Sequence, residues 1–117
     1  MAQYVLHTDE HPSAEQVWTR VTGNFPHISR ATVYNTLNLF VEKALIRQFV
    51  LTEGRVVFDP KTEDHHHFID EDSGRIHDVP WEAVKVGNAP KLAGFEVREY
   101  QVVMRGKKLK KTRSAVR

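Results

Sequence analysis

Two segments with helical apolar spacing, each opened by a capping residue and separated by a helix-breaking stretch, constrain the fold most. Ser13 and Gln16 fit a capping box, in which each side chain bonds the other residue's backbone N–H. A Gly-Asn pair and then Pro26 end this segment, and Ser29 is a natural cap for the next one. Two helices joined by such a turn predict a helix-turn-helix.

A hairpin pattern follows the second helix. Leu45–Leu51 and Arg55–Asp59 are rich in strand-forming residues, and Thr52-Glu53-Gly54 between them supplies a turn glycine. Helix, helix, hairpin is the order of a winged helix, so we expect residues 1–60 to form a winged-helix DNA-binding domain. The polar stretch that begins at Pro60 predicts a hinge.

Beyond this hinge the pattern changes to short strands. We expect strands at His65–Asp70, Arg75–Val79 and Phe95–Arg105, and a short helix at Trp81–Val86. A lobe of roughly 55 residues has a marginal core, so two such lobes gain from dimerisation or metal binding. The predicted fold class is α+β: an N-terminal winged helix-turn-helix lobe and a small C-terminal α/β dimerisation and metal-sensing lobe at 61–117.

Composition narrows the class of protein. The chain has no cysteine, which excludes disulfides and thiolate zinc sites. No apolar run approaches the roughly 20 residues that span a bilayer, and the first residues lack the pattern of a signal peptide. We expect a cytoplasmic protein without a membrane partner. A nucleophile elbow, a phosphate-binding glycine loop and an HExxH motif are all missing from the sequence, so we do not expect an enzyme.

The net charge of +2 conceals a strong asymmetry. Seven of the 17 Lys and Arg residues follow Glu99, whereas none of the 15 acidic residues does. The basic tail is either solvated or in contact with nucleic acid phosphates. Because the rest of the chain is acidic, we expect any contact with DNA to be local.

The second helix is the candidate reader of DNA. Asn can bond an adenine edge, Thr can touch a thymine methyl, and Arg can bind guanine or phosphate. The alternative is an ordinary amphipathic helix whose polar face meets water, but the hairpin after it favours DNA binding. The exposed polar residues at the start of this helix are Arg30, Thr32, Asn35 and Thr36.

Three adjacent histidines, His65-His66-His67, are the candidate metal ligands. On a strand, His65 and His67 share one face and His66 lies on the other. Imidazoles with nearby carboxylates suit Fe²⁺, Mn²⁺ or Zn²⁺. The alternative is a solvated polar strand. Three further residues could be brought near by a two-lobe fold: His11, Asp59 and Asp78. His66 could serve a second site, a haem, or nothing.

These motifs resemble the ferric uptake regulator superfamily of dimeric, metal-dependent transcription regulators. The resemblance rests on residues 11–15, on Ser29–Leu37, and on Phe58-Asp59, His65-x-His67 and Asp78. Within that superfamily the chain is most similar to the iron response regulator branch, because His65-His66-His67 is followed by Phe68 and because the segments Ile76–Pro80, Gly94–Val97 and Val102–Arg105 look alike.

The resemblance implies a set of roles. It implies a regulatory metal held by His11, Asp59, His65, His67 and Asp78, and base contacts by Tyr34. It also implies haem at His66 and His67 in the iron response regulator branch. The family's structural zinc needs two CxxC pairs, and the first falls here on Asp70 and Ser73, so we expect no structural zinc. A second regulatory site, present in many members, needs ligands where this chain has Lys85 and Tyr100, so we expect this site to be absent or altered.

The resulting hypothesis is a homodimeric repressor-type regulator that binds two-fold related, AT-rich operator DNA according to metal, with iron as the first candidate and haem as another. Two alternatives remain open. One is a metal- or haem-sensing interaction module without DNA binding. The other is a small metallohydrolase that uses the same His and Asp residues.

Overall fold

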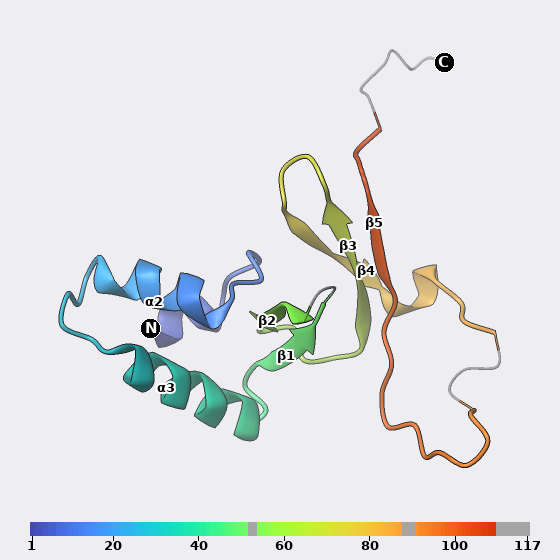
Figure 1. Cartoon of the computed structure of the whole chain (residues 1–117), viewed down its shortest axis with the longest axis horizontal. Helices are drawn as coiled ribbons and strands as arrows, with labels where there is room; N and C mark the ends of the chain where they lie inside the picture. The colour runs from blue at the N-terminus through green and yellow to red at the C-terminus, as the bar shows by residue number, and fades with distance from the viewer. Residues whose placement is uncertain (52–53, 88–90, 110–117) are drawn as a thin grey trace. The chain divides into compact units, whose positions relative to one another are not determined.

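The computed structural model describes residues 1–51, 54–87 and 91–109, which form two compact units, Met1–Asp64 and His65–Arg117 (Figure 1). Among the described residues, no helix has the length and apolar character needed to cross a bilayer.

The first unit begins with three helices: α1 (Ala2–Val5), α2 (Ala14–Thr22) and α3 (Arg30–Glu42). The capping box that opens α2 is confirmed, because Ser13 Oγ accepts the Gln16 N–H at 3.1 Å and Gln16 Oε1 accepts the Ser13 N–H at 2.8 Å. Ser29 Oγ accepts the Thr32 N–H at 3.1 Å and caps α3. Both starts were predictable because a cap acts within one helical turn.

The predicted hairpin is present as β1 (Arg47–Val50) and β2 (Val56–Asp59), paired antiparallel. The register sets Arg47 opposite Asp59 at the open end and Val50 opposite Val56 near the turn. Gly54 has φ +73°, a conformation that glycine adopts without a steric penalty. The other two residues of the predicted turn, Thr52 and Glu53, lie outside the described residues.

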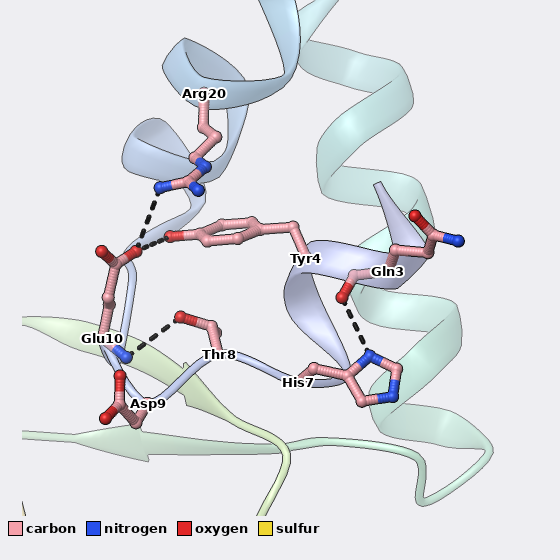
Figure 2. A pocket seen from close by; sticks show the side chains of 7 residues that line it. All are labelled: Gln3, Tyr4, His7, Thr8, Asp9, Glu10 and Arg20. Carbon is pink, nitrogen blue, oxygen red and sulfur yellow. Dashed lines mark hydrogen bonds and ion pairs between the residues drawn. The ribbon is translucent and has the colours of Figure 1, made fainter.

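Side chains around α1 tie it to α2 (Figure 2). The Tyr4 hydroxyl donates to Glu10 Oε1 at 2.7 Å, and Arg20 Nη1 lies 3.5 Å from the same oxygen. The Arg20 guanidinium also lies over the Tyr4 ring, 4.4 Å from its centre. Burial, together with the bond to Glu10, raises the pKa of Tyr4 to about 12. Because Glu10 and Arg20 are paired within the hollow that they line, we assign these side chains a structural role.

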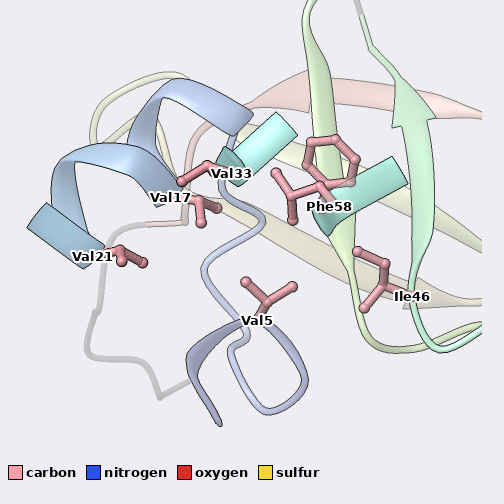
Figure 3. Packing of buried hydrophobic residues seen from close by; sticks show 7 residues of the cluster. Val5, Val17, Val21, Val33, Ile46 and Phe58 are labelled. Carbon is pink, nitrogen blue, oxygen red and sulfur yellow. The ribbon is translucent and has the colours of Figure 1, made fainter. Parts of the chain in front are cut away.

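One apolar core holds the first unit together (Figure 3). It joins α1, α2, α3 and the hairpin, and the Phe58 N–H also donates to the Pro12 carbonyl at 2.9 Å. Burying side chains of this size stabilises a fold by about 1.5–3 kcal/mol each. The core consists of Val5, Val17, Val21, Val33, Leu37, Ile46 and Phe58. It turns the polar residues of α3 outward, because α3 buries Val33 and Leu37.

The second unit is a three-stranded sheet in the order β4-β3-β5. β3 (His65–Asp70) pairs antiparallel with β4 (Ile76–Pro80) and parallel with β5 (Val103–Gly106). A short 3-10 helix, Trp81–Ala83, follows β4. The overall class is therefore α+β, as predicted.

Two sequence predictions for the second unit were wrong in extent. The strand predicted at Phe95–Arg105 is reduced to Val103–Gly106, because β5 pairs with β3 along His67–Asp70, and the described residues before Val103 form no ladder with it. The alternation of apolar and polar residues before β5 does not reflect burial, since Phe95 is 75% exposed. The helix predicted at Trp81–Val86 ends at Ala83, and Val84 is already extended.

Candidate functional site

β3 and β4 bring three potential metal ligands together within the second unit. The strand alternation predicted for the histidine run is present: the rings of His65 and His67 lie 4.7 Å apart on one face. Antiparallel register puts Asp78 opposite His67. Asp78 Oδ1 lies 3.1 Å from His65 Nε2 and 3.7 Å from His67 Nε2. Two imidazole nitrogens and one carboxylate oxygen thus converge.

The first unit contains a second group, His11 and Asp59. His11 Nε2 lies 3.1 Å from Asp59 Oδ2. The other Asp59 oxygen accepts the Lys61 N–H at 2.9 Å, which orients the carboxylate. His11 has φ +53°, a left-handed conformation that is uncommon for a residue other than glycine and is often found at functional positions.

Both groups have the chemistry of a metal site. Nitrogen and oxygen donors without sulfur suit Fe²⁺, Mn²⁺ and Zn²⁺. The residues of the second unit fit such an ion, because His65, His67 and Asp78 already point donor atoms toward one another across a pair of rigid strands. Strands hold ligands more accurately than loops do.

His66 lies on the opposite face of β3 in different surroundings. Its ring stacks on Trp81, with ring centres 4.6 Å apart and planes 13° from parallel, and it is fully buried. Its Nδ1 accepts the Val102 N–H at 2.9 Å. A haem ligand needs open space beside its ring, and His66 is fully buried and stacked on Trp81, so its surroundings weigh against the haem interpretation of His66.

The N-terminal part of α3 presents a polar face in the first unit. Tyr34 is 44% exposed, and Asn35 is exposed beside it. Two threonines are engaged locally: Thr36 Oγ1 donates to the Thr32 carbonyl, and Ser29 Oγ donates to Thr32 Oγ1. Tyr34 and Asn35 are therefore the better presented of the predicted DNA-binding residues.

Arg30, also predicted to contact DNA, is paired with another side chain of the protein. Its guanidinium Nη2 lies 2.8 Å from Glu15 Oε2, and its Nε donates to both carboxylate oxygens at 3.2 Å. The same group lies over the Trp18 ring, 4.1 Å from its centre. Sequence reasoning missed this pairing because it joins two helices, whereas capping and periodicity report only local structure.

Two helices followed by a hairpin, together with a sheet on which His and Asp side chains converge, are typical of metal-responsive DNA-binding transcription regulators. The model of the ferric uptake regulator family matches residues 1–105, and the chain belongs to this family. Because the members of this family are transcription regulators, family membership excludes the metallohydrolase alternative.

The relatives include peroxide regulators. The chain is 31% identical over 106 residues to the peroxide operon regulator of Bacillus subtilis (strain 168), which covers 89% of this chain and 73% of the relative. It is 26% identical to the crystal structure of the Campylobacter jejuni peroxide stress regulator, with a TM-score of 0.63 over 88% of this chain and 79% of the other. The ferric uptake regulator of Francisella tularensis, solved with iron, shares the fold at 22% identity and TM-score 0.65, over 85% and 77%.

Proposed function

We propose that the protein is a homodimeric regulator whose operator binding depends on one divalent cation held by His11, Asp59, His65, His67 and Asp78. The observation that carries the proposal is the convergence of His65, His67 and Asp78 on one face of β3 and β4. These three donors fill fewer positions than the four to six that Zn²⁺, Mn²⁺ or Fe²⁺ takes. His11 and Asp59, which carry matching chemistry, are the proposed remaining ligands.

The cation would act by selecting one arrangement of the chain. A ligand shifts a conformational equilibrium only by its differential affinity for the two states. An ion that binds donors from both units has such a preference, because only one arrangement satisfies all of them. We propose that this arrangement is the one that presents Tyr34 and Asn35 of both protomers to a two-fold related, AT-rich operator.

We propose peroxide as the signal and Fe²⁺ as the sensing metal. Support comes from the names of the relatives, which are peroxide regulators, whereas the sequence resemblance favours an iron response regulator. Fe²⁺ held by these nitrogen and oxygen donors would supply an electron to peroxide, whereas Mn²⁺ would do so far less readily and Zn²⁺ is redox-inactive. The alternative, in which the signal is iron status, predicts that removal of iron releases DNA and that peroxide has no effect.

The test is DNA binding by the full chain, measured by fluorescence anisotropy. A palindromic AT-rich duplex and a scrambled duplex are titrated with metal-free, Mn²⁺-loaded and Fe²⁺-loaded protein, over a salt series. We expect metal to tighten binding to the palindrome more than to the scrambled duplex, and peroxide to release DNA only from the iron form. Binding to the palindrome that is no tighter than binding to the scrambled duplex, with or without metal, would contradict the proposal, and no binding to either duplex would favour the interaction module without DNA binding.

Asp78→Asn separates the metal from the fold in this test. The amide keeps the shape of the side chain but removes the charge that a cation prefers. We expect at least a tenfold loss of Mn²⁺ affinity and a matching loss of metal-dependent DNA binding. Asp72→Asn, in the turn after β3, serves as the matched control and should retain both.

A further inference from the structure

The segment 100–102 runs beside β3 and contacts two adjacent histidines in opposite ways. The His67 backbone N–H donates to the Val102 carbonyl at 3.1 Å, which sets the register. Gln101 Oε1 then lies 2.7 Å from His67 Nδ1, and the Val102 N–H donates to His66 Nδ1 at 2.9 Å. The Nδ1 atom of His67 therefore faces a hydrogen-bond acceptor, whereas the Nδ1 atom of His66 faces a hydrogen-bond donor.

The contact with Gln101 decides where the proton of His67 lies. An amide oxygen only accepts, so His67 Nδ1 must donate and carry the proton. In the neutral ring, Nε2 is then left with the lone pair. This is the nitrogen that faces Asp78, at 3.7 Å from Oδ1. His67 is thus held in the one neutral form that can ligate a cation on that face.

The contact with Val102 gives His66 the opposite form. A backbone N–H only donates, so His66 Nδ1 accepts and its Nε2 carries the proton. No described residue accepts a hydrogen bond from this buried Nε2. A protonated nitrogen has no lone pair for a metal or a haem iron, and stacking on Trp81 opposes rotation of the ring.

We propose that Gln101 is a positioning residue that fixes the metal-binding tautomer of His67, while the adjacent Val102 fixes His66 in the form that does not bind metal. The inference rests on the proposed metal site at His65, His67 and Asp78. In a metal-bound histidine, the group that hydrogen-bonds the ring nitrogen not bound to the metal orients the ring and raises its basicity. Loss of this group costs about 10–100-fold in metal affinity.

The first experiment reads the tautomers directly in metal-free full-length protein. Long-range ¹H–¹⁵N spectra of the histidine side chains distinguish protonated from unprotonated ring nitrogens. We expect protonated Nδ1 in His67 and protonated Nε2 in His66, with His66→Leu and His67→Leu variants supplying the assignments. In Gln101→Leu the His67 signal should change to mixed tautomers while the His66 signal stays. A protonated Nε2 in wild-type His67 would overturn the proposal.

The second experiment measures the effect on a cation. Co²⁺ is the probe, because its visible absorption reports binding and geometry. We expect Gln101→Leu to weaken Co²⁺ binding at least tenfold, and Gln101→Glu, which keeps an acceptor at this position, to restore wild-type affinity. Gln48→Leu, a change of the same type at an exposed site on β1, should have no effect.

The outcomes separate the inference from the proposed function. If wild-type protein binds no Co²⁺ or Mn²⁺, the proposed metal site fails and the tautomer spectra alone judge the role of Gln101. If wild-type binds Co²⁺ and folded Gln101→Leu binds it equally well, the positioning role is wrong. Far-UV circular dichroism of each variant checks folding, and rescue by Gln101→Glu rules out a purely structural defect.

Discussion

At the scale of single residues, the chain uses three adjacent histidines for two purposes. His65 and His67 face Asp78, whereas His66 stacks on Trp81 and accepts a hydrogen bond from the backbone of the segment beside it. Strand alternation alone separates these roles, because neighbouring residues point to opposite faces. The number of histidines in such a run therefore does not give the number of metal ligands.

His66→Leu tests this division. The change removes the acceptor of the Val102 N–H and the stacking partner of Trp81, so we expect the free energy of unfolding to fall by about 1–3 kcal/mol, the usual cost of a buried group left unpaired. Co²⁺ affinity should stay within about threefold of wild type. The measurements are urea unfolding and Co²⁺ titration, with His67→Leu as the variant that should lose the metal. Loss of a haem absorption band in His66→Leu, with metal binding intact, would instead make His66 a haem ligand.

At the scale of elements, contacts between helices decide how the first unit presents α3. Glu15 of α2 holds Arg30 at the start of α3 in a bidentate ion pair over the Trp18 ring. Trp18 Nε1 also donates to the Ile28 carbonyl at 3.1 Å, which ties the turn between the helices to α2. Glu15 thus neutralises the charge of Arg30, which the sequence pattern predicts to contact DNA.

Glu15→Gln should release Arg30 for a phosphate. We expect tighter DNA binding at low salt and a steeper salt dependence, by about 0.9 in the slope of log K against log salt for one added phosphate contact. Anisotropy titrations over a salt series measure this slope. Glu42→Gln removes one exposed charge at the other end of α3 and serves as the control. An identical gain in the control would show a general charge effect, and a gain that survives Arg30→Ala would exclude the release of Arg30.

The docking of α1 predicts a dependence on high pH. The pKa of Tyr4 is raised from 10.0 to about 12, by burial and by its bond to Glu10. A raised pKa means that the protonated form is favoured by folding, so this stabilisation is complete below pH 10 and is lost as the pH rises through about 12. Tyr4→Phe should lose that decline. Absorbance of tyrosinate against pH, compared between the two proteins, locates the ionisation, and a Tyr4 that ionises at the ordinary value would contradict the contact.

At the scale of the whole molecule, the proposed ligands are divided between two units. Two belong to Met1–Asp64 and three to His65–Arg117. Neither set fills a coordination shell alone, and under the proposed function one cation binds donors from both units. Such coupling is reciprocal by thermodynamic necessity.

Operator DNA should therefore tighten metal binding by the same factor by which metal tightens DNA binding, typically about 5–150-fold. Mn²⁺ titrations with and without the palindromic duplex measure one factor, and DNA titrations with and without Mn²⁺ measure the other. Chelation should release DNA while far-UV circular dichroism stays unchanged. Unequal factors would mean that metal and DNA are not coupled through a single equilibrium.

The sequence by itself determined the features whose causes are local. The caps at Ser13 and Ser29, the hairpin around Gly54 and the strand His65–Asp70 follow from interactions within a few residues, and the spacing of His65 and His67 follows from the strand period. Only the tertiary structure decided the extent of β5, the pairing of Arg30 with Glu15 and the contact of Gln101 with His67. The last joins residues 34 positions apart, and no local pattern encodes which side chain a sheet brings to a histidine.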